Sequence, residues 1–381
     1  MNPLILLLTT TLFCTLSLAF GQFEAQVIDQ KVAIGYGLAI GDLDGDGKDD
    51  ILLADKSEIV WYQNGSWQRR VITRNLTIRD NVCLAARDLT EDGKVEMAVG
   101  AQWNPGNTQD AFQSGSVHLL QRPEEVNRSW PSMHLYHEPT IHRMHWVKVG
   151  EGSFQLLVLP LHGIGNQKGA GEDVKLLTYP WLGRTTHVQA TPVPTGMHMT
   201  HNFDVIPGEG QTESVIIGGK EGIQQFDWAG NSWTGKWLVK GVGFGEVRQG
   251  KGKKGTFIAG IEPIHGNILS IHSWNKKGEI KREVLTDDLN QGHALACADL
   301  LGKGEDQIVV GWRNPNANGK TGIRLYERTK KGSWVRHLID DNVMACEDLK
   351  VADLNGDGKQ DIIAAGRASH NLIIYWNRTS K

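Results

Sequence analysis

Short runs of apolar residues, separated by turn residues, recur along the whole chain. In the first such group, residues 38–43, 50–54, 59–62 and 68–72 alternate with segments rich in Gly, Asp, Asn and Ser. Runs of this length bounded by turn residues are typical of β-strands rather than helices. Four consecutive short strands within about 50 residues predict one antiparallel four-stranded sheet, which is the blade of a β-propeller.

The same rhythm returns six more times along the chain. The first two strands of the later repeats are expected at residues 84–88 and 96–100, 145–149 and 156–159, 202–206 and 214–218, 246–248 and 256–260, 294–299 and 307–311, and 349–353 and 361–365. Because the same unit recurs along the whole chain, we expect residues 22–381 to form a single all-β domain, a seven-bladed β-propeller.

The seventh repeat is incomplete at its end. After the apolar run at residues 372–376 only five residues remain, too few for a turn and a fourth strand. The segment 24–29 near the start of the chain has the pattern of the missing strand. We therefore expect the last blade to be closed by the N-terminal strand, because that pairing covers two otherwise exposed sheet edges.

The first residues of the chain differ in character from the repeats. Residues 3–20 are almost entirely apolar or hydroxylic, and Ala19-Phe20-Gly21 resembles a cleavage site with small residues at its outer positions. The alternative is a membrane anchor, for which the stretch is short. We expect residues 1–21 to be a signal peptide, and the mature chain to be secreted or periplasmic without a membrane span.

The charge and cysteine content exclude some classes of protein. Forty Lys and Arg residues nearly balance 43 Asp and Glu residues, and no basic run is present, which argues against a nucleic-acid partner. Outside the leader, Cys83, Cys297 and Cys346 form an odd set without the spacing of a disulfide framework. We expect buried free thiols, although one bridge is possible. The sequence does not set the oligomeric state and is compatible with a monomer.

Two loops between first and second strands are rich in Asp and Gly. Oxygen ligands at alternate positions, with glycines between them, can wrap a hard cation such as Ca²⁺. The expected calcium ligands are Asp42, Asp44, Asp46, the Lys48 carbonyl and Asp50 in the first blade, and Asp353, Asn355, Asp357, the Lys359 carbonyl and Asp361 in the seventh. The alternative is an Asp/Gly turn without metal. If calcium binds, we expect its role to be structural.

The Asp-x-Asp-Gly-Asp-Gly-Lys-x-Asp-Ile pattern that begins at residue 42 resembles the FG-GAP/VCBS repeat family. This resemblance implies a β-propeller but no single function, because the family includes adhesion heads, lectin-like modules and enzymes. The His-rich central repeats also resemble the propeller of aldos-2-ulose dehydratase and propeller-fold polysaccharide lyases. The second resemblance implies an enzyme that acts on a carbohydrate.

Reactive side chains gather at the opposite ends of the strands. Four of them, His142, His198, His293 and Glu347, lie six residues before the position that we align with Asp42, which predicts one height around the central channel. The candidate catalytic residues are His142, His145, His198, His201, His293, Arg313 and Arg367. The candidate substrate-binding residues are Trp103, His162, Lys220, His265, Trp312, Glu347 and His370.

Two of these histidine pairs are constrained by strand geometry. Residues three apart on a regular strand face opposite sides, so His142 and His145 cannot both enter the channel unless a bulge intervenes. The same holds for His198 and His201. One member of each pair is therefore expected to pack between blades, and a single histidine taken alone is more often structural than functional.

Two kinds of chemistry fit the cluster as a whole. Neutral imidazoles and a carboxylate can bind a transition metal such as Zn²⁺ or Mn²⁺. Alternatively, histidine acts as general base and acid, cationic side chains stabilise an enolate, and tryptophan stacks on a sugar. The leading hypothesis is a secreted lyase or dehydratase that acts by β-elimination on a uronic or keto sugar. The alternatives are a non-enzymatic glycan-binding or adhesion propeller, and a scaffold.

Overall fold

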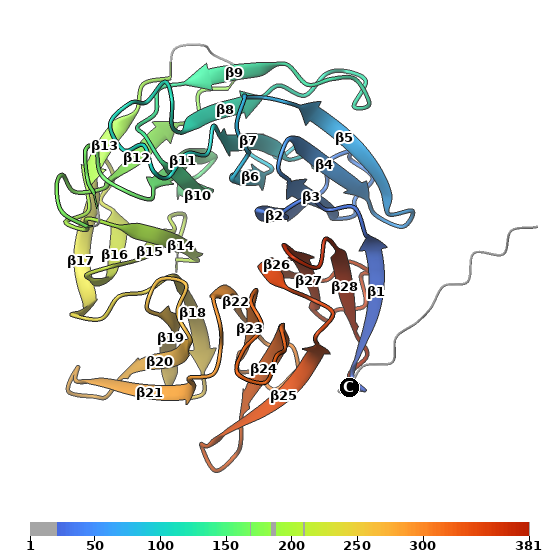
Figure 1. Ribbon diagram of the computed structural model, residues 1–381, viewed down its shortest axis with the longest axis vertical. Coiled ribbons are helices and arrows are strands. Elements are labelled where there is room, and N and C mark those ends of the chain that lie inside the picture. The colour runs from blue at the N-terminus through green and yellow to red at the C-terminus, as the bar shows by residue number, and fades with distance from the viewer. Residues whose placement is uncertain (1–20, 168, 184–187, 209, 381) are drawn as a thin grey trace, which may run out of the picture.

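The computed structural model describes residues 21–167, 169–183, 188–208 and 210–380. Residues 1–20 of the expected signal peptide lie outside this part of the chain. Within it, 28 β-strands form seven separate four-stranded antiparallel sheets around a central axis (Figure 1). In the same residues we find no helix that could cross a bilayer. The predicted all-β, seven-bladed propeller is confirmed.

Each of the first four blades uses four strands that are consecutive in the chain. Blade one contains β2 (Gly37–Gly41), β3 (Asp50–Ala54), β4 (Glu58–Gln63) and β5 (Gln68–Arg74). Blade two contains β6 (Cys83–Arg87), β7 (Glu96–Ala101), β8 (Ser116–Leu120) and β9 (Ser132–Leu135). Blade three contains β10 (Ile141–Gly150), β11 (Ser153–Pro160), β12 (Lys175–Pro180) and β13 (Thr191–Pro194). Blade four contains β14 (Thr200–Ile206), β15 (Ser214–Gly219), β16 (Gly222–Trp228) and β17 (Trp233–Lys240).

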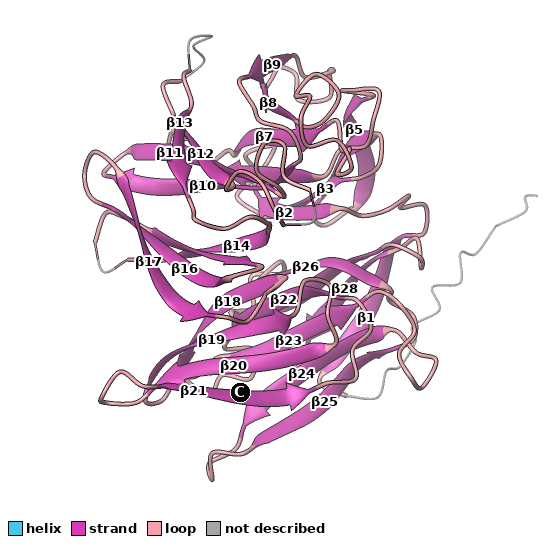
Figure 2. Cartoon of the chain, turned by 60° about the vertical axis from the view of Figure 1, so that its left-hand side comes forward, coloured by secondary structure: helices cyan, strands magenta, loops and turns pink. Residues whose placement is uncertain are grey.

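The remaining blades complete the ring. Blade five contains β18 (Glu246–Gly252), β19 (Gly255–Glu262), β20 (Ile268–Trp274) and β21 (Ile280–Thr286). Blade six contains β22 (Gly292–Ala298), β23 (Gln307–Trp312), β24 (Gly322–Arg328) and β25 (Trp334–Asp341). Blade seven contains β26 (Cys346–Ala352), β27 (Asp361–Gly366), β28 (Leu372–Asn377) and, as its outermost strand, β1 (Phe23–Asp29). Figure 2 shows the same sheets turned to the side.

The ring closes where its two ends meet. Strand β1 pairs antiparallel with β28, with Phe23 opposite Asn377 and Ala25 opposite Tyr375, and the two strands lie side by side in Figure 1. Phe23 is buried in the apolar cluster between blades six and seven. The N-terminal strand thus supplies both a hydrogen-bond ladder and apolar contact, which confirms the predicted closure of the last blade.

The hydrophobic core is divided among the interfaces between blades. Seven apolar clusters are found in the described residues, and each joins two neighbouring blades. Between blades seven and one, for example, Leu38 and Ile51 pack with Ile363 and Ile374. Since every blade is held by its two neighbours, loss of one blade exposes two apolar faces at once.

The three cysteines are unpaired, as expected. Cys83 and Cys346 are buried, and burial raises the pKa of the Cys83 thiol to about 12. A Cβ atom added to Gly100 would lie 2.5 Å from the Cys83 sulfur, and one added to Gly311 would lie 2.5 Å from the Cys346 sulfur. The Cys83 thiol therefore fills a close contact within blade two, and the Cys346 thiol fills one between blades six and seven. Neither buried thiol is poised to react.

A buried carboxylate fixes the segment that leads from the closing strand into blade one. Asp55 is 4% exposed and accepts hydrogen bonds from the backbone N–H groups of Ala33, Ile34 and Gly35, at 2.8, 2.7 and 3.0 Å. The backbone N–H groups of this turn have no partner in a sheet, and the Asp55 carboxylate accepts all three of these hydrogen bonds. Asp55 therefore couples β1 to the start of β2.

We predict that Asp55→Ala lowers the free energy of unfolding by about 3 kcal/mol, because it leaves buried N–H groups without an acceptor. Urea unfolding followed by tryptophan fluorescence measures this change. The control is Asp287→Ala, since Asp287 is exposed and should change stability by less than about 0.5 kcal/mol. Equal effects of the two changes would contradict this role of Asp55.

Candidate functional site

Four of the innermost strands begin with a β-bulge at the same place. In β10, Ile141 pairs with Pro160 and Arg143 pairs with Leu159, so His142 is the extra residue. The same register shift occurs at His201 in β14, at His293 in β22 and at Glu347 in β26. Because a bulge re-aims the side chain of its extra residue, these four side chains are set apart from the regular alternation of their strands.

The bulges show which residues lie at one height around the channel, and this set differs at one position from the predicted set. His142, His293 and Glu347 belong to it, but His201 occupies the position that we had expected for His198. The error came from aligning Asp204 with Asp42. Asp204 lies inside β14 (Thr200–Ile206), whereas Asp42 follows the end of its strand.

Each histidine at a bulge is anchored to the next blade. The Nδ1 atom of His142 lies 2.7 Å from the His201 carbonyl oxygen, and that of His201 lies 2.9 Å from the Gly245 carbonyl oxygen. His293 Nδ1 lies 2.6 Å from the Glu347 carbonyl oxygen. A carbonyl oxygen can only accept, so each Nδ1 carries the proton and donates it. The lone pair of each neutral ring is therefore on Nε2.

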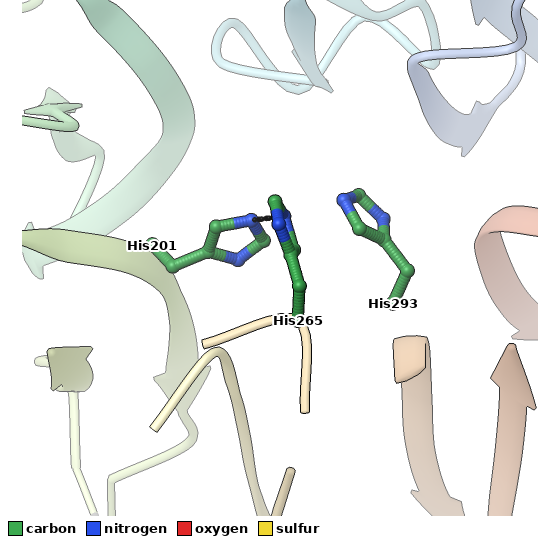
Figure 3. Close-up of side chains that lie close together, drawn as sticks. All are labelled: His201, His265 and His293. Carbon is green, nitrogen blue, oxygen red and sulfur yellow. Dashed lines mark hydrogen bonds between the residues drawn. The ribbon is translucent and has the colours of Figure 1, made fainter. Parts of the chain in front are cut away.

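Two of these rings converge with a third imidazole, that of His265 from the loop between β19 and β20 (Figure 3). The Nε2 atoms of His201 and His265 are 2.7 Å apart. The rings of His265 and His293 stack, with centroids 4.9 Å apart and an interplanar angle of 29°. One nitrogen from each ring lies within 4.8 Å of the others. We call His201, His265 and His293 the His triad.

The loop that carries His265 is held from inside blade five. His265 has a positive φ of 52°, and a Cβ atom on Gly266 would lie 2.0 Å from the Glu262 carbonyl oxygen. The Glu262 carboxylate is buried and binds Arg282 at 2.5 Å, and it also accepts a hydrogen bond from Ser270. The tight turn and the anchored carboxylate together place His265 over the channel.

Burial keeps the imidazoles neutral. It lowers the pKa of His142 and His293 well below the usual range, and it also lowers the pKa of His201. The pKa of His265 falls to about 2, first because of burial and then because His201 and Arg313 are close. Neutral imidazole is the form that binds a metal ion or accepts a proton.

Three guanidinium groups lie near the triad. Glu347 is 2% exposed, and its carboxylate binds Arg313 at 3.0 Å and Arg367 at 2.9 Å. Arg143 donates to the His142 carbonyl oxygen at 3.0 Å, and within the described residues it forms no ion pair with a carboxylate. Arg143, Arg313 and Arg367 all lower the pKa of His265, so three cations act on one imidazole. A single carboxylate, Glu347, pairs with two of them.

The Asp-rich loops lie at the other ends of the innermost strands. Oxygens of Asp42, Asp44 and Asp50 lie within 4.8 Å of one another, close enough to share a cation. The Gly47 N–H group donates to Asp42 at 2.7 Å, and the equivalent bond in blade seven joins Gly358 to Asp353 at 2.8 Å. The two loops are therefore built alike.

The remaining ligands expected in these loops keep matching places. Asp46 and Asp357 each accept the N–H group two residues later, from Lys48 and Lys359, at 2.9 Å. Asp361 corresponds to Asp50, and burial raises the pKa of each carboxyl to about 6. Asn355 Oδ1 accepts the Asp357 N–H group at 3.0 Å. The side chains thus already face the loop interior, where a cation would bind.

Residues 37–99 match the family model described as the FG-GAP-like repeat. This chain is a β-propeller that contains an FG-GAP-like repeat. The matched residues span blade one and the first two strands of blade two, including the loop at Asp42. The Asp cluster described above is thus part of the FG-GAP-like repeat.

The chain is also similar to the aldos-2-ulose dehydratase of Phanerodontia chrysosporium. The two are 24% identical over 358 residues, which cover 84% of this chain. The chain spans only 38% of the length of that relative. The similarity therefore extends through most of the propeller but leaves the larger part of the relative unmatched.

Solved structures share the fold. A chain of BBS1N in complex with ARL6DN matches with a TM-score of 0.58 at 14% identity, covering 93% of this chain and 95% of its own length. The periplasmic gluconolactonase PpgL of Pseudomonas aeruginosa matches with a TM-score of 0.55 at 15% identity, covering 84% and 88%. At these identities the likeness shows the fold alone.

Two of the predicted catalytic histidines lie apart from the triad. The His145 ring packs edge-on against Phe203 at 4.7 Å, and its pKa falls to about 3 because of burial and the nearby charge of Lys350. His198 pairs instead with Glu221 at 3.0 Å and is about one-third exposed. One member of each histidine pair therefore belongs to the mouth of the channel and the other does not.

Two predicted sugar-binding residues are also placed elsewhere. Trp312 is 2% exposed, its indole donates to the Lys320 carbonyl oxygen at 2.8 Å, and Arg324 covers its ring. It belongs to the packing between blades five and six. Lys220 is exposed and contacts the Gly169 carbonyl oxygen at 3.4 Å. Neither side chain faces the His triad.

The other predicted binding residues lie around the channel mouth. The Trp103 ring is 5.0 Å from that of His142. His162 follows β11 and forms a bridge with Met199, and burial lowers its pKa. His370 is exposed in the loop between β27 and β28, and its Nδ1 atom lies 3.0 Å from the Val32 carbonyl oxygen. Of these three, Trp103 has the direct contact with the bulge residues.

Sequence reasoning missed two residues at the mouth. Arg143 directly follows the bulge of β10. Its guanidinium lies 3.3 Å from the His142 ring nitrogen Nε2, a contact that the sequence does not indicate. Tyr36 lies under the Arg367 guanidinium at 5.5 Å and donates to Asp80 at 3.0 Å. Tyr36 directly precedes the first strand of blade one. Other blades have reactive residues at this position, so the position itself could have identified Tyr36 as a candidate.

We predict that Co²⁺, used as a spectroscopic probe, binds at the His triad in one equivalent. The reason is that one nitrogen from each of three neutral imidazoles lies within 4.8 Å of the others. Titration followed by visible absorption measures the binding, and His293→Ala should weaken it by about 100-fold or more. His370→Ala is the control, because His370 is anchored to Val32. Unchanged binding by the His293 variant would contradict this assignment.

Proposed function

We propose that this chain is a secreted carbohydrate lyase or dehydratase that acts by β-elimination on a uronic or keto sugar at the mouth of the channel. The observation that carries the proposal is the convergence of three neutral imidazoles and three guanidiniums at one end of the channel. Similarity to aldos-2-ulose dehydratase, a dehydratase by name, supports the same class of reaction.

Elimination of this kind has three chemical requirements. A base must remove the proton from the carbon next to a carbonyl or carboxylate group. Positive charge must then stabilise the enolate that forms on that group. Finally, the C–O bond at the next carbon must break, and the leaving oxygen must take up a proton from a general acid, a role that the protonated base can fill. Each requirement needs a group of matching charge, held at a fixed place.

His142 is the candidate base. Its Nδ1 proton is committed to the His201 carbonyl oxygen, so the lone pair is on Nε2, 3.3 Å from a guanidinium nitrogen of Arg143. Burial holds its pKa well below the usual range, which keeps that lone pair unprotonated at neutral pH. Its ring lies 4.6 Å from His201 and 5.0 Å from Trp103. A sugar stacked on Trp103 would therefore present a C–H bond near His142.

The His triad would hold a divalent transition metal such as Zn²⁺ or Mn²⁺, because its donor atoms fit that role. His201 and His293 donate their Nδ1 protons to backbone carbonyls, an arrangement that orients metal-binding histidines in many proteins. A bound metal would supply Lewis acidity to a carbonyl or carboxylate oxygen of the substrate. The protein's own part is to hold one nitrogen of each ring within 4.8 Å of the others.

The guanidiniums favour a substrate with negative charge. Glu347 balances one of the two charges of Arg313 and Arg367, whereas among the described residues the acceptors for Arg143 are the carbonyl and a ring nitrogen of His142. An uncompensated cation beside the base would bind a carboxylate and stabilise the enolate. This arrangement favours a uronic sugar over a neutral keto sugar.

The Asp-rich loops would bind Ca²⁺ and hold the closing blades. They belong to blades one and seven, the two neighbours at the point of closure. The Asp50 and Asp361 carboxyls are buried, and a cation would replace the proton that burial favours there. Calcium is thus proposed as a structural ion, distant along the strands from the reacting groups.

We predict that His142→Ala lowers kcat/KM for elimination by about 10²- to 10⁴-fold, since it removes the base. Absorbance of the unsaturated product, measured across uronic oligosaccharides and keto sugars, reports the rate. His198→Ala is the matched control, because His198 lies outside the cluster. Full activity of the His142 variant would contradict the proposed base. Sugar binding without turnover would instead support the glycan-binding propeller.

We predict that removing calcium with EGTA lowers the stability of the ring. A ligand at 100 times its dissociation constant contributes about 2.7 kcal/mol, so chelation should produce a fall in Tm of several degrees. Differential scanning calorimetry measures the shift. Asp42→Asn should reduce the calcium-dependent part, whereas Asp299→Asn in blade six should not. A calcium-independent Tm in the unaltered chain would contradict the structural role.

A further inference from the structure

Four Asn-x-Ser/Thr sequences occur in the chain, at Asn64, Asn75, Asn127 and Asn377. We infer that only Asn75 and Asn127 accept N-linked glycan, and that Asn64 and Asn377 instead join neighbouring blades. The inference rests on the proposed export, because the transferase acts on exported chains. It goes beyond the proposed reaction, since it concerns the outer surface.

Asn64 uses both protons of its side-chain amide. Its Nδ2 atom donates to the Asp49 carbonyl oxygen at 2.7 Å and to the Leu354 carbonyl oxygen at 2.8 Å. Its backbone N–H group donates to the Asp50 carboxylate at 2.7 Å. Leu354 belongs to the Asp-rich loop of blade seven, so this one residue connects the loops of blades one and seven.

Asn377 repeats the arrangement one blade earlier. Its Nδ2 atom donates to the Gln360 carbonyl oxygen at 3.0 Å and to the Leu300 carbonyl oxygen of blade six at 2.8 Å. Its backbone N–H group donates to the Asp361 carboxylate at 2.8 Å. The residue has no exposed surface. Two equivalent asparagines with the same three bonds indicate a built interblade clamp rather than a chance contact.

Blade two makes a similar connection with a different side chain. There the Arg122 guanidinium donates to the carbonyl oxygens of Leu43 and Val95. Leu43 holds the place in the blade-one loop that Leu354 holds in blade seven. Arginine takes the place of asparagine here and cannot carry an N-linked glycan. The shared property of the two side chains is that they donate hydrogen bonds to backbone carbonyl oxygens.

The two other asparagines are free to react. Asn75 follows β5 and is exposed, and its side-chain amide has no hydrogen-bond partner among the residues described. Asn127 is exposed in the loop between β8 and β9, where its Oδ1 atom accepts from Arg70. That bond leaves the Asn127 Nδ2 atom pointing to solvent without a protein acceptor in the described chain.

The chemistry of transfer separates the two kinds of site. A lipid-pyrophosphate-linked oligosaccharide is the donor; the asparagine Nδ2 atom forms a bond to the first sugar carbon and loses one proton. The bond from that carbon to the pyrophosphate oxygen breaks, and the lipid pyrophosphate leaves. At Asn64 or Asn377, the Nδ2 proton that would be lost takes part in a hydrogen bond that the folded chain needs. The attached sugar would also lie between two blades.

The test is to secrete the chain from eukaryotic cells, with residues 1–21 replaced by an established leader so that failure of export is separated from choice of site. Enzymatic removal of glycan in H₂¹⁸O converts each occupied asparagine to labelled aspartate, which peptide mass spectrometry detects. We expect label at Asn75 and Asn127 and none at Asn64 or Asn377. Occupancy at either clamp position in folded, secreted protein would overturn the inference, as would absence at both exposed positions.

Single variants provide a second readout. Asn75→Gln and Asn127→Gln should each remove one glycan and leave the deglycosylated Tm unchanged. Asn64→Ala should lower the Tm by several degrees without changing glycan mass. Ser66→Ala is the matched control, because it removes the Asn64 sequence and keeps the amide; glycan mass and Tm should both stay the same. Equal Tm values for Asn64→Ala and Asn75→Ala would overturn the clamp.

Discussion

The antiparallel pairing of β1 with β28 is the interaction on which the rest of the structure depends. Without it, blade seven has three strands, and the apolar cluster that Phe23 completes is open to water. In the described residues each apolar cluster joins two neighbouring blades, so the ring keeps its diameter only while every such interface is complete. The channel, and with it the distances among residues from different blades, follows from that closure.

The same closure sets the geometry of the candidate site. Glu347 begins the innermost strand of blade seven, and its backbone carbonyl fixes the ring of His293 in blade six. Its carboxylate gathers Arg313 from blade six and Arg367 from blade seven. A change in the spacing of blades would therefore disturb the tautomer of one imidazole and the position of two guanidiniums together.

The two ends of the innermost strands have separate tasks. At their starts, the bulges place His142, His201 and His293, and the side chains are neutral and buried. At their ends, the acidic loops carry carboxylates that need a cation or a backbone donor. In a propeller the first end opens on the channel mouth, whereas the second contacts the loops of adjacent blades, as Asn64 and Asn377 show.

The sequence predicted the blades and their closure well because strand length, turn residues and alternation act locally and repeat seven times. It predicted His265, Arg313 and Glu347 at the mouth because loops between given strands fall on a known face. It failed at His198 because Asp204, which was aligned with Asp42, lies inside β14 and not after the end of its strand. It also failed at Trp312, whose burial depends on Arg324 and on the neighbouring blade.

The charges at the channel mouth impose a last constraint on what can bind there. Burial keeps the imidazoles neutral, so they add no positive charge, while Arg143, Arg313 and Arg367 outnumber the single carboxylate that pairs with them. These guanidiniums are only partly buried, with the Arg313 side chain 14% and the Arg367 side chain 41% exposed. Their excess positive charge therefore lies at the end of the channel that the bulges shape, where an anionic ligand or a developing enolate would balance it.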